Sequence, residues 1–337
     1  MVHKQRKPIA ILGAGSWGTA IAISVTRDDE PAILWGRDKA QMSTLESTRC
    51  NIRYLPDVSL PPALQLRADL EQTITNAGDI IVVVPSHGFR SVLETIAPFM
   101  DSQQRIAWAT KGFESGSGKL LHEVTQDVFG NEKSFAVISG PTFAREVARG
   151  LPTAVTVASN DPQFANFLAQ RLHTDTFRVY TSDDIVGVEV GGAVKNVLAI
   201  AAGIADGLQF GANARTALIT RGLAEIMRLG NALGGQRETF MGLAGLGDLV
   251  LTCTDNQSRN RRLGLGIGQG QSLEDALAAI DQVVEGVQTA REVNELAISR
   301  GVDMPITHEV YRILYEGEKP RAAVHALLSR EQKAEVI

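Results

Sequence analysis

Short apolar runs alternate with longer segments of helical apolar spacing over the first half of the chain. The runs are rich in Val, Ile and Ala, and they occupy residues 9–12, 32–35, 64–67, 80–84, 106–109, 135–138, 154–158 and 177–180. Strands that alternate with helical crossovers form a mainly parallel sheet covered on both faces. The pattern therefore predicts an α/β fold with a doubly wound parallel sheet.

The apolar spacing changes after Thr181. Residues 182–184, Ser-Asp-Asp, form a helix-start signal, and from there to Ile337 the periodicity is helical, with stops at glycine and no convincing strand. We interpret two glycine-rich places as loops between helices: Gly234-Gly235, and the run Gly264, Gly266, Gly268 and Gly270. The sequence therefore predicts two domains, residues 1–182 and an all-helical domain of residues 183–337.

The first apolar run leads directly into a glycine motif. Gly13, Gly15 and Gly18 have the spacing G-x-G-x-x-G, and small residues 19–25 continue as a predicted helix. In a dinucleotide-binding turn the first glycine permits the tight turn, the second lets the backbone approach a pyrophosphate, and the third lets helix and strand pack closely. This context favours a Rossmann-type domain with a nicotinamide cofactor over a glycine turn without a ligand.

Composition narrows the choice of partners. The chain has 337 residues, 44% apolar and 21% charged, with 33 basic against 38 acidic side chains and a net charge of −5. That balance gives no field that would gather nucleic acid or an anionic membrane. The two cysteines, Cys50 and Cys253, are far apart and have no metal-ligand spacing, so we expect no metal and a reduced, cytoplasmic setting. No export signal is visible, and the apolar stretch 186–208 contains charged residues, so we expect a buried helix and no membrane insertion.

The residues after the second apolar run bear on the choice of cofactor. In this fold the end of the second strand meets the adenosine ribose, where an acid binds the 2′-hydroxyl of NAD and an arginine accommodates the 2′-phosphate of NADP. Here Arg37 comes first and Asp38 follows. Because a guanidinium forks onto phosphate oxygens, we favour NADP, with NAD also accepted. The alternative is a solvated loop pair of Arg37 and Asp38.

Three further segments follow predicted strands, where ligands bind in open parallel sheets: residues 85–87, 110–112 and 139–144. Lys111 follows the run 106–109, and we interpret it as a substrate or cofactor contact rather than a solvated charge. Gly140 and Thr142 combine a permissive backbone with a hydroxyl, although Thr142 could simply cap a helix over residues 143–149.

In the helical half, Lys195 is the outstanding residue. On a 3.6-residue period it lies among Gly191, Gly192, Ala199 and Ala202, the smallest side chains of an apolar helix. Small neighbours allow close approach by another backbone or a ligand, and a lysine there is costly unless it has a partner or a function. The alternative is a lysine that extends past a tightly packed helix pair.

Three later features complete the candidate site. Asp248 could fix a neighbouring hydroxyl or ammonium, and residues 258–262, Ser-Arg-Asn-Arg-Arg, suit a phosphate dianion. The alternative for Arg261 or Arg262 is exposed charge only. Glu285 could reach cofactor hydroxyls or could be a helix-terminus carboxylate.

Taken in order, these motifs closely resemble the bacterial NAD(P)-dependent glycerol-3-phosphate dehydrogenases. The matching segments are residues 13–18, 110–112, 139–144, 191–196, 245–248, 258–261 and 285–289. The resemblance implies a Rossmann domain, then an all-helical domain of the 6-phosphogluconate dehydrogenase type, with the active site between them. It also implies reversible reduction of dihydroxyacetone phosphate to sn-glycerol 3-phosphate for glycerophospholipid synthesis.

The resemblance also assigns roles residue by residue. It implies that Lys195 is the proton acceptor and that the substrate lies among Lys111, Gly140, Thr142, Lys195, Asp248, Ser258, Arg259 and Asn260. The implied cofactor positions are Gly13, Gly15, Ser16, Trp17, Gly18, Arg37, Lys111, Ala144, Arg259, Val283 and Glu285. Helical domains of this kind often dimerise, which favours a homodimer.

Two other functions stay open at this point. A β-hydroxyacid dehydrogenase would share the architecture and a helical lysine but bind a substrate carboxylate. A regulatory protein that binds nucleotide without catalysis would keep the glycine turn, but it would have no reason to keep Lys195, Asp248 and Arg259 together.

Overall fold

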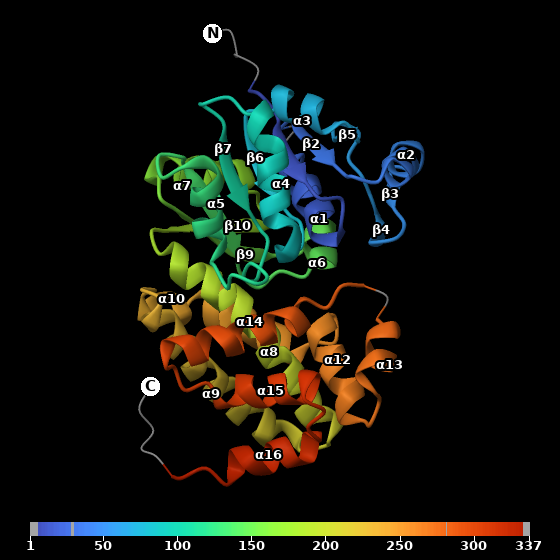
Figure 1. The fold of residues 1–337 in the computed structure, drawn as a ribbon. Helices are drawn as coiled ribbons and strands as arrows, with labels where there is room; N and C mark the ends of the chain where they lie inside the picture. Colours follow the sequence, from blue (N-terminus) through green and yellow to red (C-terminus); the bar gives the residue numbers. More distant parts are fainter. Residues whose placement is uncertain (1–5, 28–29, 281, 333–337) are drawn as a thin grey trace. The chain divides into compact units, whose positions relative to one another are not determined.

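The computed structural model describes residues 6–27, 30–280 and 282–332, which form two units (Figure 1). The first unit contains the described residues up to Lys111 together with Leu121–Ile185. The second contains Gly112–Leu120 and the described residues from Val186 onward. Phe113 and Leu120 are buried in the hydrophobic core of the second unit, so the chain enters that unit once before it returns to the sheet. The predicted ranges, 1–182 and 183–337, did not anticipate this excursion.

An eight-stranded sheet forms the centre of the first unit. Its strands are β1 (Ile9–Leu12), β2 (Ala32–Trp35), β5 (Gln65–Arg67), β6 (Asp79–Val82), β7 (Arg105–Trp108), β8 (Phe135–Ser139), β9 (Thr153–Ser159) and β10 (Phe177–Ser182). Every residue of β1, β2 and β6 is buried, as expected for strands covered on both faces. All eight predicted strands are confirmed: β1 and β2 have the predicted bounds, and the bounds of the others differ by at most two residues.

The strand order is β10-β9-β8-β7-β6-β1-β2-β5. The chain runs outward from β1 to β2 and β5, and then from β6 outward on the other side, so the order reverses between β1 and β6. Right-handed crossovers in opposite directions place helices on both faces, which is a doubly wound sheet. The pairs are parallel except β8 with β9. The predicted fold class is confirmed.

Helices cover this sheet, and one small hairpin extends from it. The helices are α1 (Ser16–Val25), α2 (Lys39–Thr48), α3 (Leu70–Asn76), α4 (Phe89–Ile96), α5 (Leu121–Phe129), α6 (Ala144–Arg149) and α7 (Pro162–Leu172). Between α2 and β5 the chain forms an antiparallel hairpin of β3 (Cys50–Asn51) and β4 (Leu55–Ser59), which the apolar pattern did not predict. With only two residues in β3, the hairpin is too short to produce a recognisable alternation.

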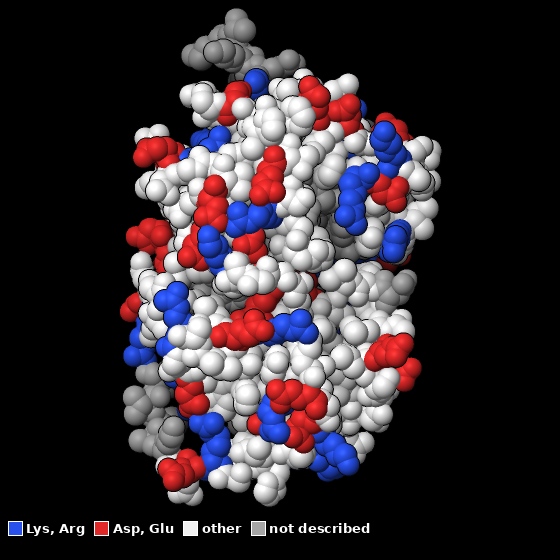
Figure 2. Space-filling view, in the orientation of Figure 1, with Lys and Arg blue, Asp and Glu red and all other residues white. Residues whose placement is uncertain are grey.

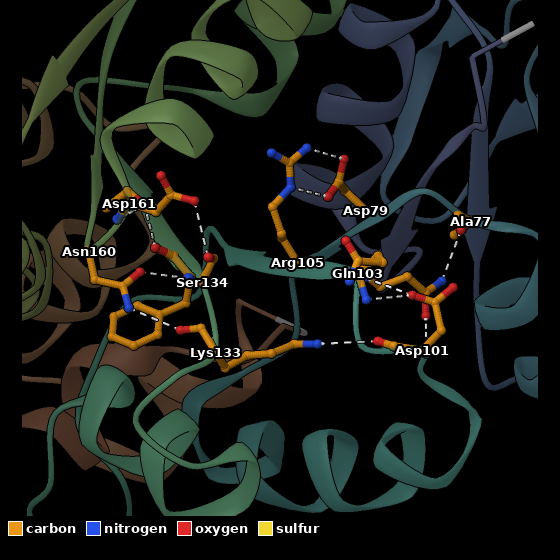
Figure 3. A network of polar contacts seen from close by, with 12 residues as sticks. Ala77, Asp79, Asp101, Gln103, Arg105, Lys133, Ser134, Asn160 and Asp161 are labelled. Carbon is orange, nitrogen blue, oxygen red and sulfur yellow. Dashed lines mark hydrogen bonds and ion pairs between the residues drawn. The ribbon is translucent and has the colours of Figure 1, made fainter. Parts of the chain in front are cut away.

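The amino ends of the central strands are closed by polar contacts (Figure 3). Arg105, the first residue of β7, pairs with both carboxylate oxygens of Asp79, the first residue of β6, at 2.7 and 2.9 Å. Its guanidinium also lies against the rings of Phe164 and Phe167. This edge of the sheet is occupied by side chains that pair with one another, whereas the candidate residues follow the opposite, carboxyl ends.

The second unit is helical: among its described residues the structure has no strand. Its helices are α8 (Ile185–Gly207), α9 (Gly211–Ala232), α10 (Arg237–Phe240), α11 (Asp248–Thr254), α12 (Arg259–Gly268), α13 (Leu273–Ala278), α14 (Glu285–Arg300), α15 (Pro305–Tyr315) and α16 (Pro320–Leu328). Among the described helices, α8 alone is long and apolar enough to cross a membrane, and 89% of its most apolar stretch is buried in the protein. It is the core helix of this unit, as predicted.

The prediction of a loop at the glycine run 264–270 is wrong for three of its four glycines. Gly264, Gly266 and Gly268 lie inside α12 rather than in a loop. A Cβ on Gly264 would lie 2.0 Å from the carbonyl oxygen of Ile200 in α8, and one on Gly268 would lie 2.4 Å from that of Ile204. The glycines therefore let the backbones of α8 and α12 touch, a use of glycine that spacing along one helix does not reveal.

Candidate active site

The glycine motif forms the turn between β1 and α1. Gly13 has φ +126°, which favours glycine, and a Cβ there would lie 2.3 Å from the carbonyl oxygen of Val83. A Cβ on Gly18 would lie 1.9 Å from the carbonyl oxygen of Gly13, so this position serves close packing of helix and turn. Nothing lies within 4 Å of a Cβ built on Gly15. The open side of the turn at Gly15 therefore fits a dinucleotide, whose pyrophosphate needs close access to backbone N–H groups.

Polar side chains fix the surroundings of this turn. The carbonyl oxygen of Ala14 accepts from Gln41 Nε2 at 2.8 Å and from Asn51 Nδ2 at 3.1 Å. Ser16, the first residue of α1, donates its hydroxyl to the carbonyl of Tyr54 at 3.0 Å. Trp17 follows, and its buried indole Nε1 has no hydrogen-bond partner within the described residues. The first turn of α1 is thus held by α2 and the hairpin.

The two charged residues of the loop after β2, Arg37 and Asp38, have different surroundings. Asp38 is the N-cap of α2, where its carboxylate accepts from the backbone N–H groups of Ala40 and Gln41 at 2.9 and 3.1 Å. Arg37 is exposed directly after β2. Asp38 is exposed too, and its carboxylate lies at the start of a helix, where negative charge is favourable.

At the carboxyl edge, three of the predicted residues meet around one carbonyl group. The oxygen of Gly140 accepts from Lys111 Nζ at 3.3 Å and from the Thr142 hydroxyl at 3.2 Å. Gly140 has φ +152°, and a Cβ there would lie 3.0 Å from the Cα of Val155. The hydroxyl of Thr142 does not cap the next helix: α6 begins at Ala144 with Phe143 as its N-cap. The reading of Thr142 as a cap is corrected.

Lys195 lies in the middle of α8 with only 7% of its surface exposed. Its Nζ donates to Asp248 Oδ1 at 2.5 Å and to the Thr252 hydroxyl at 2.9 Å, both in α11. Asp248 is 1% exposed, so this is a buried ion pair. Each charge is therefore compensated by its partner within the helical core. Of the two roles foreseen for Asp248, the structure has the ammonium contact.

The structure explains why a small residue lies near Lys195 at position 191. A Cβ on Gly191 would lie 2.6 Å from the carbonyl oxygen of Ala244 in the π-helical segment Leu243–Gly247, directly before α11. The absence of a side chain thus lets the backbone that leads into Asp248 approach α8. This outcome agrees with the expectation that small neighbours admit another backbone.

Thr252 was not foreseen. It accepts from Lys195 and donates to the backbone carbonyl of Asp248 at 2.6 Å, one helical turn earlier. Its position four residues after Asp248 could have indicated that both side chains lie on one face of a helix. The neighbouring Cys253 has no part in this chemistry, because burial raises the pKa of its thiol to about 12 and leaves it protonated.

The predicted phosphate segment forms the start of α12. Ser258 is the N-cap, and its hydroxyl oxygen accepts from the N–H of Arg261 at 3.2 Å. Asn260 Nδ2 donates to Asn196 Oδ1 at 2.9 Å, and Asn260 Oδ1 accepts from the N–H of Gly286 at 2.9 Å. Asn260 therefore joins α8, α12 and α14.

The three arginines of this segment differ. Arg259 Nη1 donates to the carbonyl of Val283 at 2.7 Å. Arg261 is buried and pairs with Asp206 at 2.8 Å, so it is a structural ion pair rather than exposed charge. Arg262 is exposed. Glu285 is the first residue of α14, the helix-terminus position foreseen as its alternative, and Val283 is 52% exposed two residues before it.

Asn196, next to Lys195, was quoted in the motif without a role. It is 3% exposed, and its buried Nδ2 has no hydrogen-bond partner within the described residues. A buried amide donor left without a partner is costly, so it marks a place where a ligand oxygen would be favourable.

Together these features define a class of protein: a dinucleotide-binding sheet joined to a helical unit with a buried lysine–carboxylate pair, the design of nicotinamide-dependent dehydrogenases. Family models narrow the class. The model described as the NAD-dependent glycerol-3-phosphate dehydrogenase N-terminus matches residues 8–165, and the model of the C-terminus matches residues 184–325. The chain belongs to the NAD-dependent glycerol-3-phosphate dehydrogenase family, which confirms the resemblance found in its motifs.

Individual relatives agree with the family models. The chain is 57% identical over 328 residues to "Glycerol-3-phosphate dehydrogenase [NAD(P)+]" from Thioalkalivibrio sulfidiphilus, covering 97% of this chain and 98% of that protein. It has the same identity and coverage with the protein of that description from Aeromonas hydrophila. A crystal structure of glycerol-3-phosphate dehydrogenase from Coxiella burnetii superimposes with a TM-score of 0.94 at 50% identity, covering 96% of this chain and 99% of that one.

Proposed function

We propose that this protein is an NAD(P)-dependent sn-glycerol-3-phosphate dehydrogenase, which reversibly reduces dihydroxyacetone phosphate. Family membership over both units supports this activity. The observation that carries the chemistry is the ion pair of Lys195 with Asp248, buried in a helix core and supported by Thr252.

When bound, the dinucleotide supplies the hydride, and Lys195 handles the proton. In the reducing direction its ammonium protonates the alkoxide oxygen that forms at C2 of the substrate. In the oxidising direction the neutral amine accepts the hydroxyl proton. Asp248 and Thr252 hold the amine in place through hydrogen bonds of 2.5 and 2.9 Å.

We propose that the substrate phosphate binds at the start of α12. Ser258 uses its oxygen as an acceptor in the cap, so its O–H remains as a donor. Asn260 uses one Nδ2 hydrogen toward Asn196, which leaves the second. Arg259 binds Val283 through Nη1 and has further N–H groups to offer. Lys111, Gly140, Thr142, Lys195 and Asp248 complete the proposed substrate residues.

The proposed cofactor residues belong to both units. The turn residues Gly13, Gly15, Ser16, Trp17 and Gly18 face the phosphates, and Arg37 favours NADP because it is exposed where the adenosine ribose is expected while Asp38 is engaged in its cap. We further propose cofactor contacts for Lys111, Ala144, Arg259, Val283 and Glu285.

The two predicted domains have different proposed roles. Residues 1–182 contribute most of the proposed dinucleotide contacts, and residues 183–337 supply the catalytic lysine, the phosphate-binding residues and the remaining cofactor contacts. We also propose a cytoplasmic homodimer that makes sn-glycerol 3-phosphate for glycerophospholipid synthesis, without nucleic-acid partners or membrane insertion.

A spectrophotometric assay tests the activity. The purified protein should oxidise NADPH, and NADH more weakly, when dihydroxyacetone phosphate is added. Small substrates with a carboxylate in place of the phosphate should give no oxidation. Preference for such a carboxylate would support a β-hydroxyacid dehydrogenase, and stoichiometric cofactor binding without turnover on either substrate would support a regulatory protein.

A further inference from the structure

The β3–β4 hairpin carries a feature that the proposed function does not yet use. Its connecting residues 52–54 lie beside the glycine turn, because both ends of this connection are bonded to it. Asn51 Nδ2 donates to the carbonyl of Ala14 at 3.1 Å and to the hydroxyl of Thr19 at 2.8 Å. The carbonyl of Tyr54 accepts from Ser16 at 3.0 Å. The tip of the hairpin is therefore fixed against the first turn of α1.

The base of the hairpin is also held in place. Asp57 in β4 pairs with Arg145 and Arg149, both in α6. Arg49, the residue directly before β3, donates to the carbonyl of Leu64 at 3.0 Å. Because it is bonded to α1, to α6 and to the chain before β5, the hairpin presents its tip in a defined position rather than as a loose loop.

Arg53 lies at this tip and is exposed. Its guanidinium lies over the ring of Tyr54, 5.2 Å from the ring centroid, and among the described residues no carboxylate pairs with it. The nearby acids have other partners: Asp57 is neutralised by two arginines, and Asp38 caps α2. Figure 2 shows further basic side chains over the region of α2 and the hairpin, with acidic side chains among them. The tip therefore offers an uncompensated positive charge beside the glycine turn.

We propose that Arg53 binds the pyrophosphate of the nicotinamide dinucleotide, opposite the backbone N–H groups of the turn. This inference rests on the proposed cofactor site. The pyrophosphate is favoured over the 2′-phosphate because the hairpin is bonded to Ser16 at the start of α1, where the phosphates meet the helix. The 2′-phosphate is expected at the end of β2, where Arg37 lies. The planar fork of a guanidinium suits two phosphate oxygens.

The test measures binding rather than turnover. Dissociation constants of NADPH and NADH are determined by isothermal titration calorimetry for the wild type and for Arg53→Gln. We expect the substitution to weaken both cofactors alike, by roughly fivefold to twentyfold, as for one partly screened charge-assisted contact. The loss should shrink as salt is raised. Because Arg53 is exposed, the thermal midpoint of the cofactor-free protein should not change.

Arg178→Gln is the matched control. Arg178 in β10 is also exposed and also lies over a nearby ring, that of Tyr180, with its guanidinium 5.6 Å from the centroid. It lies at the opposite edge of the sheet from β2 and β5. Binding by Arg53→Gln that matches this control would overturn the inference, and so would a loss confined to NADPH, which would place Arg53 at the 2′-phosphate. A wild type that binds neither dinucleotide would instead overturn the proposed function.

Discussion

At the scale of single residues, Lys195 is the group on which the proposed chemistry depends. Replacing it with Ala removes the proton donor, and turnover should fall by roughly 10²- to 10⁴-fold. Cofactor affinity should change little, because the binding turn lies in the other unit. The measurement is steady-state kinetics with dihydroxyacetone phosphate, together with calorimetric titration of NADPH.

The titration also serves as the control for folding, since the substitution leaves Asp248 buried without its partner. Near-normal turnover by the variant would remove Lys195 from the mechanism.

The proposed preference for NADP depends on another single residue, Arg37. Arg37→Gln should raise the dissociation constant of NADPH by roughly tenfold or more and leave that of NADH within about twofold, because only NADP carries the phosphate that the guanidinium would bind. Competition between the two cofactors in one titration measures the ratio of their dissociation constants directly. Equal losses for both would show that Arg37 does not read the 2′-phosphate.

At the scale of elements, the crossing of α8 and α12 brings Asn196 and Asn260 together. A methyl group on Gly264 would lie 2.0 Å from the backbone of Ile200, so Gly264→Ala must push the helices apart. We expect a loss of stability of roughly 1–3 kcal/mol and a raised KM for dihydroxyacetone phosphate. Chemical denaturation and initial rates measure the two effects.

Gly88→Ala, at a glycine outside the α8–α12 crossing, is the control variant for Gly264→Ala. Gly88 has φ −100°, and nothing lies within 4 Å of a Cβ built there, so its stability should stay within about 0.5 kcal/mol of the wild type. Similar losses for the two alanine variants would show that the close helix contact is not what Gly264 provides.

At the scale of the whole molecule, two buried acids make stability depend on pH. Burial raises the pKa of both Glu225 and Glu292 to about 7, from the ordinary glutamate value of 4.5. Glu225 accepts hydrogen bonds from Ile306 and Thr307 at the start of α15, whereas Glu292 Oε2 is buried without a partner within the described residues. Between about pH 4.5 and 7 the folded protein binds more protons than the unfolded chain, so stability falls as pH rises through this range.

Glu292→Gln tests this dependence. The amide keeps an acceptor for Gln288 but carries no charge, so the thermal midpoint at pH 8 should rise by roughly 2–5 °C and its fall between pH 4.5 and 7 should become shallower. The exposed Glu274 in the same unit is the control, and Glu274→Gln should keep the wild-type slope. A wild-type midpoint that rises over this range would contradict the raised pKa values.

Much of the fold could be predicted because its signals are local. The strands follow from apolar runs, and the β1 turn follows from Gly13, Gly15 and Gly18, whose spacing is set by a few consecutive residues. The prominence of Lys195 also follows from its own helix, where a lysine among small residues is costly. For the same reason the ordered motifs identified the family before any contact was known.

Only the tertiary structure decided which of these residues meet. Lys195 pairs with Asp248 and Thr252, which lie more than 50 residues later in the chain. The glycines of α12 are needed because the backbone of α8 packs directly against them. The position of Arg53 beside the turn likewise depends on hydrogen bonds across the hairpin. Periodicity along one element records which face is buried, but it contains no information about the partner that covers it, since that partner is chosen by packing.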